Sequence, residues 1–217
     1  MALSISKPKT QKRIGMYGGA FDPPHNAHVA LAQAAIEQLG LDTLHVIPTG
    51  HAWHKAQQLT LGFHRLAMAE KAFGHIPHVF VDQREVLRTG ATYSLDTLRE
   101  LQAENPEAQL YLVMGADQAI ALPTWSHFDE IAKLAIICVA KRSLTGSNNT
   151  GNISYISTLN SLNCRAIHIE LPNMLESATD VRDLVLHHKP VNHLLPSSVL
   201  AYIEAHRLYQ SNIRPNI

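Results

Sequence analysis

Short apolar runs alternate with amphipathic segments along most of the chain. Apolar residues recur at helical spacing over 26–39, 60–73 and 93–104, and two further helices are predicted at about 179–209. Strands that alternate with helices form right-handed βαβ units, so we predict an α/β fold with a doubly wound, mostly parallel sheet and helices on both faces. The apolar runs with the length of strands are 13–18, 44–49, 78–82, 109–115, 134–140 and 165–171.

The length of the chain indicates one domain. With 217 residues the chain can form one full core, and we predict a single domain over 13–217 after a flexible N-terminal tail at 1–12. Residues 143–163 are nearly uncharged and rich in Ser, Asn, Thr and Gly, which predicts a long loop. The helices at about 179–209 form a small C-terminal helical part of the domain.

The composition argues against several kinds of partner. Lys and Arg number 18, as do Asp and Glu, so no basic footprint for nucleic acid or an anionic membrane is present. Cys138 and Cys164 lack metal-ligand spacing, and the apolar surroundings of Cys138 predict a buried thiol. No apolar run has membrane-spanning length, and the N-terminus lacks the apolar core of a signal peptide, so we expect a cytoplasmic protein.

The segment GGAFDPPHNAH, residues 18–28, follows the first predicted strand. Parallel sheets bind ligands at the carboxyl ends of their strands. Gly18 and Gly19 would let a phosphate approach the backbone, beside the positive end of the following helix. His25 and His28 can face the same ligand, and a ring N–H can donate to a phosphoryl oxygen whose charge grows during transfer. No covalent nucleophile lies nearby, so catalysis would depend on positioning and charge stabilisation.

Other interpretations of this segment compete with phosphate binding. The chain has 14 histidines, so a chance pair on a helix surface is the simplest alternative. Zinc would need three or four ligands, and two imidazoles do not supply them. The segment matches neither the Walker A loop nor the G-x-G-x-x-G dinucleotide fingerprint.

GGAFDPPHNAH resembles the G-x-F-D-P-x-H-x-G-H segment of the nucleotidyltransferase superfamily, whose members have a Rossmann-like fold. SATDVR (177–182) resembles the second signature of that superfamily, Ser-x-Thr-x-x-Arg. From Arg13 to Tyr209 the chain is similar to the bacterial nicotinate-nucleotide adenylyltransferase family. The matching segments are ATYSLDTLREL (91–101), MGADQ (114–118), LPTWSHFDEI (122–131) and LPSSVLAYIEAHRLY (195–209).

The chain departs from the family pattern at three positions. Ala27 stands where the family has Gly between the histidines, and Trp53 stands where it often has Pro. Glu176 occupies a position that is usually apolar, directly before the Ser-x-Thr signature. None of these departures removes a catalytic group, but Ala27 and Glu176 change the surroundings of the expected ATP site.

The resemblance implies that the adenylyl group of ATP is transferred to nicotinate mononucleotide, giving deamido-NAD and pyrophosphate by direct in-line attack at the α-phosphorus. It also implies Mg²⁺ with ATP, and the absence of an obvious carboxylate cluster is consistent with a metal held by substrate and water. Another phosphorylated acceptor, such as nicotinamide mononucleotide or phosphopantetheine, is the nearest alternative. A nucleotide-binding sensor without catalysis and a histidine-rich metal-binding module are alternatives from other classes. The sequence allows a homo-oligomer but does not fix the oligomeric state.

The resemblance further implies a set of site residues. The expected catalytic residues are His25, His28 and Arg182. The residues expected to bind ATP are Gly18, Gly19, Ala20, Phe21, His28, Gly115, Asp117, Ser177, Thr179 and Arg182. The residues expected to bind the acceptor are His25, His54, Lys55, Tyr93, Ser94, Trp125 and Arg142, and no residue is expected to be a resident metal ligand.

Several of these residues also have a simpler interpretation. Arg182 would be a solvated helix charge, although Val181 marks a buried stripe that leaves Arg182 facing elsewhere. Asp117 would be the N-cap of the next helix, Trp125 a core residue and Lys55 an exposed lysine.

Overall fold

The structure, a computed structural model, describes residues 11–50, 59–142, 159, 162, 164–172, 174 and 176–210. Its strands form one sheet in the order β3-β2-β1-β4-β5-β6, and every pair of neighbours is parallel. This is the strand order of a doubly wound Rossmann sheet, so the predicted α/β fold is confirmed. The strands are β1 (Arg13–Gly19), β2 (Thr43–Pro48), β3 (Val79–Val81), β4 (Gln109–Met114), β5 (Ala135–Arg142) and β6 (Ala166–Leu171).

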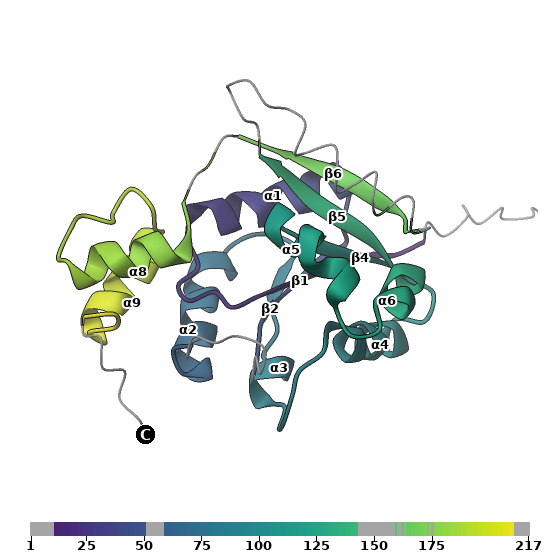
Figure 1. Cartoon of the computed structure of the whole chain (residues 1–217), viewed down its shortest axis with the longest axis horizontal. Coiled ribbons are helices and arrows are strands. Elements are labelled where there is room, and N and C mark those ends of the chain that lie inside the picture. Colours follow the sequence, from purple (N-terminus) through teal and green to yellow (C-terminus); the bar gives the residue numbers. More distant parts are fainter. Residues whose placement is uncertain are drawn as a thin grey trace, which may run out of the picture.

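Helices cover both faces of this sheet (Figure 1). One core cluster joins α1, α2, α8 and α9 to the face that carries Tyr17, and the other joins α4, α5 and α6 to the face that carries Met16. Alternate residues of a strand point to opposite faces, which is why these two neighbours belong to different clusters. The helices are α1 (Asn26–Leu39), α2 (Gly62–Phe73), α3 (Arg84–Leu87), α4 (Ser94–Glu104), α5 (Ala116–Ala121), the 3-10 helix η1 (Leu122–Thr124), α6 (Phe128–Leu134), α8 (Ala178–Leu186) and α9 (Ser197–Ala205).

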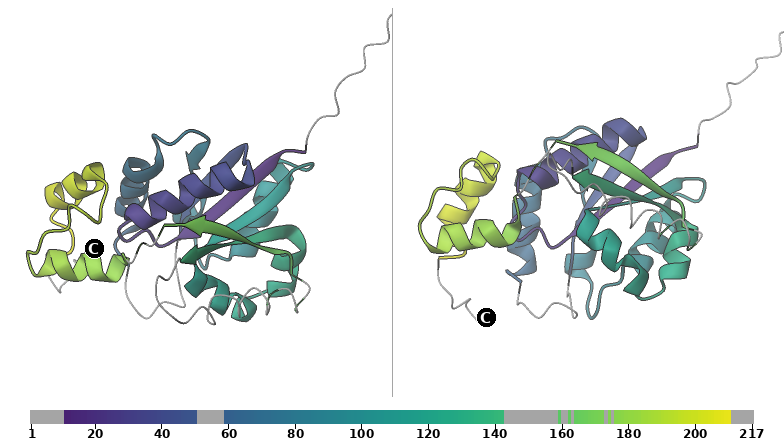
Figure 2. Two further views of the ribbon diagram at one scale, coloured as in Figure 1. Left: turned by 90° about the horizontal axis from the view of Figure 1, so that it is seen from above. Right: turned by 45° about the horizontal axis from the view of Figure 1, so that its top comes forward.

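The C-terminal helices α8 and α9 lie beside α1 and α2 at one end of the molecule (Figure 2). Asn26, the first residue of α1, makes two hydrogen bonds to the segment between α8 and α9. Its backbone N–H donates to the Leu194 carbonyl at 2.9 Å, and its side-chain amide donates to the His193 carbonyl at 3.0 Å. On α2, the Lys71 carbonyl accepts from the Ser198 hydroxyl at 2.9 Å. The C-terminal helical part of the domain is thereby docked against α1 and α2.

The helices at 26–39, 60–73 and 93–104 and the two C-terminal helices all form, within two residues of their predicted starts where the structure resolves them. Gly40 ends α1 in the left-handed conformation, with φ 59°, as the sequence predicts. The short helices α3, η1 and α6 are not predicted by the sequence, because three to seven residues are too few to show a helical period. The short helix α5 enters only through the alternative interpretation of Asp117 as an N-cap. The predicted loop at 143–163 lies outside the described residues except for Leu159 and Leu162, and the proposed domain limits stay a prediction.

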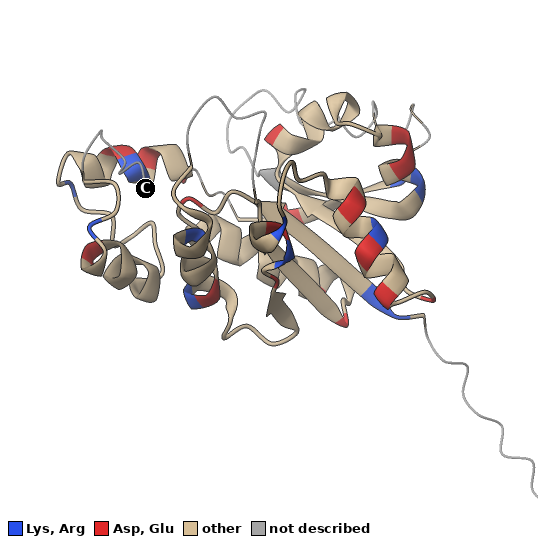
Figure 3. Cartoon of the chain, turned by 90° about the horizontal axis from the view of Figure 1, so that it is seen from below, with Lys and Arg blue, Asp and Glu red and all other residues tan. Residues whose placement is uncertain are grey.

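Two expectations from composition can be compared with the structure. Cys138 is fully buried in β5, and burial raises the pKa of its thiol to about 12, so it is an inert core residue. Positively and negatively charged residues are both scattered over the described ribbons in Figure 3, in line with the balanced composition. Within the described residues, no helix is both long and apolar enough to cross a membrane.

Candidate active site

The expected nucleotide site lies where the direction of strand order reverses, between β1 and β4. The chain leaves β1 toward β2 on one side and leaves β4 toward β5 on the other. Gly18 and Gly19 end β1, and Gly115 follows β4 as the N-cap of α5. A crevice outside the carboxyl ends of strands at such a switch point is where open α/β sheets bind ligands.

The loop after β1 is built around a buried aromatic ring. Phe21 is 1% exposed, and its ring meets those of Tyr17, Phe73 and His28 edge-on, with centroids 5.3, 5.3 and 5.2 Å away. The side chain is therefore part of the core, and only its backbone can border a nucleotide. The residue adopts φ 47°, in the left-handed region that non-glycine residues rarely occupy.

The two glycines at the end of β1 differ in the space available for a side chain. A Cβ on Gly19 would lie 2.9 Å from Cζ of Phe21, so Gly19 is needed for the packing of that ring. Its predicted contact with a phosphate stays a prediction beside this packing role. A Cβ on Gly18 would meet only Cε of Met16, at 3.8 Å, so Gly18 is the position that leaves open backbone.

His25 and His28 form a stacked pair at the start of α1. Their ring centroids are 3.7 Å apart with planes tilted by 32°. The His25 backbone N–H donates to Nδ1 of His28 at 3.2 Å, so the proton of neutral His28 lies on Nε2. Burial, and then the charge of His25, hold the pKa of His28 well below its ordinary value. His28 is thus a neutral Nε2–H donor in a fixed orientation.

Arg182 connects the two motifs that lie at opposite ends of the sequence. Its Nη1 donates to the backbone carbonyl of Asp22 at 2.7 Å, and its Nη2 donates to the hydroxyl of Thr179 at 3.2 Å. Val181 is fully buried on the other side of α8. The interpretation of Arg182 as a solvated helix charge is therefore wrong, and the side chain lies against the loop that leads to the histidines.

The remaining residues of the second motif have local partners. Ser177 is the N-cap of α8: its hydroxyl accepts from the Asp180 N–H at 3.1 Å and donates to the Asp180 carboxylate at 2.6 Å. Its predicted contact with a phosphate stays a prediction beside this capping role. Thr179 is exposed in the first turn. Oε2 of Glu176 is shielded from solvent and has no hydrogen-bond partner among the described residues.

The loop after β1 is also organised by three residues for which the sequence predicts no role: Asp22, Arg65 and Tyr209. Asp22 is 2% exposed, and its carboxylate accepts from the Thr60 N–H at 3.0 Å and from the Tyr209 hydroxyl at 2.6 Å. Arg65 is 3% exposed and donates to the backbone carbonyl of Ala20 at 3.0 Å. A signal for Arg65 was present, because Arg65 precedes the buried Met68 and Ala69 by three and four residues and so shares their helix face.

The expected acceptor residues are only partly described. Tyr93 is the N-cap of α4 and Ser94 its first residue, so both lie at the positive end of the helix dipole. Trp125 follows η1 and is half-buried against the core cluster of α4, α5 and α6. His54 and Lys55 lie outside the described residues, and Arg142 ends β5 with a side chain that is not described.

Asp117 is exposed in the first turn of α5, whose N-cap is Gly115. The alternative that Asp117 is the N-cap of this helix is therefore wrong. Its exposed carboxylate lies just beyond the end of β4, where the predicted contact with a ribose hydroxyl pair stays open to test.

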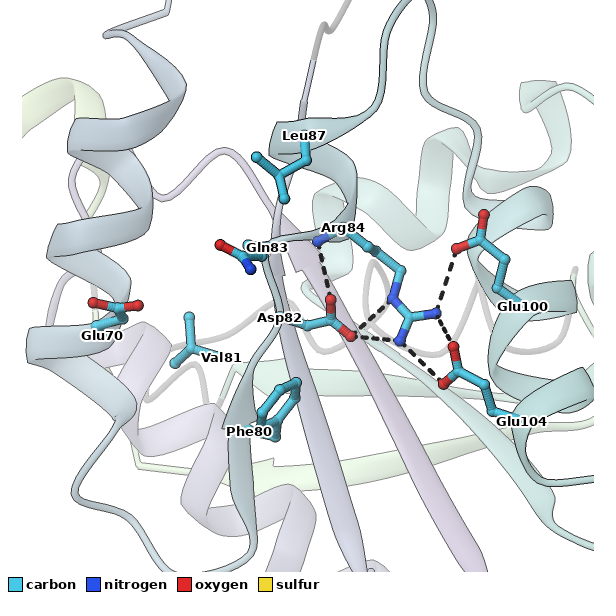
Figure 4. Close-up of a pocket in the computed structure, with 9 residues that line it drawn as sticks. All are labelled: Glu70, Phe80, Val81, Asp82, Gln83, Arg84, Leu87, Glu100 and Glu104. Carbon is cyan, nitrogen blue, oxygen red and sulfur yellow. Dashed lines mark hydrogen bonds and ion pairs between the residues drawn. The ribbon is translucent and has the colours of Figure 1, made fainter.

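A separate hollow of about 520 Å³ lies at the β3 edge of the sheet (Figure 4). Arg84 lies within it and donates to Asp82 at 2.8 Å, to Glu104 at 2.9 and 3.1 Å and to Glu100 at 3.3 Å. With Glu70 also in the lining, carboxylates outnumber this one arginine. Such a hollow repels phosphates, and none of its lining residues belongs to the two motifs.

No group of three or more His, Cys, Asp or Glu side chains within the described ranges could hold a metal ion. The alternative of a histidine-rich metal-binding module gains no support from this part of the chain. Mg²⁺ that arrives bound to the phosphates of a nucleotide needs no such group.

The chain is similar to known proteins over almost its whole length. The family model described as cytidylyltransferase-like matches residues 16–184. A probable nicotinate-nucleotide adenylyltransferase of Albidiferax ferrireducens is 47% identical over 92% of this chain and 99% of its own length. One from Bacillus pumilus is 33% identical over 92% of this chain and 100% of its own. The similarity to these relatives therefore extends over almost the whole length of both chains.

A solved structure supports the fold. Nicotinic acid mononucleotide adenylyltransferase of Plasmodium falciparum, in complex with NaAD, superposes with a TM-score of 0.75 and 18% identity, over 94% of this chain and 100% of that one. The residues that the family model matches, 16–184, include both motifs and the strands between them. The chain belongs to the cytidylyltransferase-like family and, within it, to the nicotinate-nucleotide adenylyltransferases.

Proposed function

We propose that this protein transfers the adenylyl group of ATP to nicotinate mononucleotide in NAD biosynthesis. The observation that carries the proposal is the hydrogen bond between Arg182 and the Asp22 carbonyl, at 2.7 Å, which brings the second motif against the loop of the stacked histidines. A cation and two aligned imidazoles at the end of a central strand form a site for a polyanion, and relatives across the whole chain carry the name of this activity.

The reaction joins two phosphorylated molecules. A phosphate oxygen of nicotinate mononucleotide attacks the α-phosphorus of ATP, the bond from that phosphorus to the bridging oxygen of the β-phosphate breaks, and pyrophosphate leaves with the electron pair. The protein must hold two polyanions in line and stabilise the charge that develops on the phosphoryl oxygens. No proton needs to be removed from the attacking phosphate, so the chain needs donors of hydrogen bonds more than a general base.

His28 has the properties of such a donor. Because Nδ1 accepts from the His25 N–H, Nε2–H is available to a phosphoryl oxygen in a fixed direction. His25, 5% exposed and stacked on that ring, limits its movement. We assign Arg182 to the β- and γ-phosphates, since its guanidinium contacts the loop that leads to the histidines.

The acceptor's pyridine ring is proposed to lie between Trp125 and the start of α4. Backbone N–H groups and the helix dipole at Tyr93 and Ser94 would favour the negative carboxylate of nicotinate over the neutral amide of nicotinamide. Trp125, half-buried, offers one ring face for stacking. This arrangement supports nicotinate mononucleotide as the preferred acceptor.

Mg²⁺ enters this proposal as part of the substrate Mg–ATP, held by phosphate oxygens and water. It would supply positive charge to the phosphates, and no described side chain is assigned to bind it. A cytoplasmic location and a homo-oligomeric state are further parts of the proposal that need their own measurements.

The deciding experiment is the release of pyrophosphate from Mg–ATP with nicotinate mononucleotide, nicotinamide mononucleotide or phosphopantetheine offered separately. We expect fast release with the first acceptor and little with the others. Release with another acceptor alone would replace the acceptor assignment, and ATP binding without release in any of the three assays would favour a nucleotide-binding sensor.

A further inference from the structure

Arg65 is a buried arginine whose hydrogen bonds all go to backbone carbonyls. It lies on α2 with 3% of its surface exposed and, within the described residues, forms no ion pair. Its Nε donates to the Thr60 carbonyl at 2.8 Å, Nη1 to the Ala20 carbonyl at 3.0 Å and Nη2 to the Gly50 carbonyl at 3.4 Å. Burial lowers the pKa of Arg65, and the nearby Asp22 carboxylate opposes that shift. Burial of a charged group costs free energy, so we expect this side chain to have a role that offsets the cost.

The three carbonyls belong to the loops after β1 and β2. Ala20 directly follows β1, whereas Gly50 and Thr60 lie on either side of the segment 51–58. The guanidinium is a planar fork with several fixed donors, so one side chain can fix the orientation of peptide groups in both loops. Lysine, with a single point charge on a flexible stem, could not replace it in this role.

The bond to Ala20 determines where the next amide points. The peptide that joins Ala20 to Phe21 is planar and trans, because the cis bond of the described chain is Asp22–Pro23. In such a peptide the carbonyl and the N–H point in opposite directions. Since the carbonyl of Ala20 faces Arg65, the N–H of Phe21 faces away from it, and among the described residues this N–H has no hydrogen-bond partner.

We propose that Arg65 is a positioning residue of the adenylyl transfer. By holding the Ala20 carbonyl it keeps the Phe21 N–H directed at a phosphate of the bound nucleotide, and it maintains the left-handed conformation of Phe21 at φ 47°. The inference rests on the proposed function, since it assumes that nucleotide phosphates bind at the end of β1. It concerns a side chain that touches no substrate and acts through the backbone.

Arg65→Lys is the decisive variant, and Arg84→Lys is its matched control. Arg84 is also a mostly buried arginine with several hydrogen bonds, but its partners are carboxylates at the β3 edge. We expect both variants to lower Tm. Arg65→Lys should also lower kcat and kcat/KM together by about 100-fold, the loss seen when one preorganised donor is removed. Arg84→Lys should keep both constants close to those of the unchanged protein.

Kinetics are measured at a temperature well below the Tm of both variants. If Arg65→Lys folds and keeps kcat within about twofold of the unchanged protein, the proposal is overturned and Arg65 only supports the fold. If Arg84→Lys loses as much activity as Arg65→Lys, the loss reflects general destabilisation and the proposal fails as well.

A measurement on the unchanged protein decides the matter if the variant does not fold. Addition of a non-hydrolysable ATP analogue should shift the Phe21 amide resonance and slow its hydrogen exchange. A Phe21 amide that does not respond while neighbouring amides do would overturn the proposal. This experiment needs no acceptor, so it separates failure of the positioning role from failure of the proposed reaction, which the acceptor assay tests.

Discussion

The hydroxyl of Tyr209 donates a hydrogen bond of 2.6 Å to Oδ1 of Asp22, across 187 residues of sequence. The other carboxylate oxygen accepts from the Thr60 N–H at 3.0 Å, and the Asp22 carbonyl accepts from Arg182 at 2.7 Å. Burial, followed by the Asp22 carboxylate, raises the pKa of Tyr209, so the phenol stays protonated and remains a donor. Asp22 is therefore the point at which the loop after β1, the start of α2 and the C-terminal segment meet.

Removal of the Tyr209 hydroxyl should weaken both stability and catalysis. In Tyr209→Phe, we expect the free energy of unfolding to fall by about 2 kcal/mol, because the lost hydrogen bond is made to a buried charged group. Turnover should also fall, because Asp22 precedes the histidines by three and six residues. Urea unfolding and steady-state kinetics measure the two effects.

Tyr202→Phe is the control for this prediction. The Tyr202 hydroxyl pairs with Nδ1 of His64 at 3.0 Å, in a half-buried contact between α9 and α2 that involves no residue of the two motifs. Its loss should cost about 1 kcal/mol and leave turnover unchanged. If both variants keep full turnover, the contact of Tyr209 with Asp22 serves stability alone.

The two glycines at the end of β1 should respond differently to a methyl group. Gly19→Ala places a Cβ 2.9 Å from the Phe21 ring and should destabilise the protein by about 1–3 kcal/mol through overpacking. Gly18→Ala meets only Met16, at 3.8 Å, and should leave Tm nearly unchanged while raising the KM for ATP. Thermal unfolding and ATP titrations separate the cases, and equal Tm losses would contradict the assignment of the open position to Gly18.

Arg182 and Ser177 should also separate binding from stability. Arg182→Met removes a cation from the proposed β- and γ-phosphate site, so ATP should bind at least about tenfold more weakly while AMP binds as before. Ser177→Ala removes the N-cap of α8 and should cost about 1 kcal/mol of stability. Calorimetric titration with ATP and AMP tests both variants. An equal loss of ATP and AMP affinity in Arg182→Met would show that this side chain does not face the outer phosphates.

The sequence predicted the parallel α/β sheet, because long apolar periods are local signals. The two motifs, which are also local signals, led to the expectation of a nucleotide site after the first strand. It did not predict the interactions around Asp22. The residues that interact with its carboxylate, Thr60, Arg65 and Tyr209, come from distant segments that only the fold brings together. It also did not predict that Gly19 packs against the ring of Phe21. A glycine looks the same in sequence whether a ligand or a ring occupies the space beside it.

The pKa of His28 should make stability depend on pH. In the folded protein this pKa lies well below its ordinary value, because burial and the neighbouring His25 disfavour a charged ring. Protonation would also place a hydrogen on Nδ1, the atom that accepts from the His25 N–H. The unfolded chain therefore binds the proton more readily than the folded one below about pH 6.5, the ordinary pKa of histidine.

It follows that stability is fully present above about pH 6.5 and is lost as the pH falls from there toward the folded pKa, by at most about 1.4 kcal/mol per pH unit from this group. His28→Gln should flatten that slope, because glutamine does not titrate. The comparison is the free energy of unfolding in urea at pH 7, 6 and 5 for both proteins, and the difference between them isolates His28 from other titrating groups. Parallel slopes would mean that the pKa of His28 is the same in the folded and the unfolded protein, so that burial and His25 do not keep the ring neutral. The assignment of His28 as a donor that its surroundings hold neutral would then fail, and part of the population would be an imidazolium below about pH 6.5.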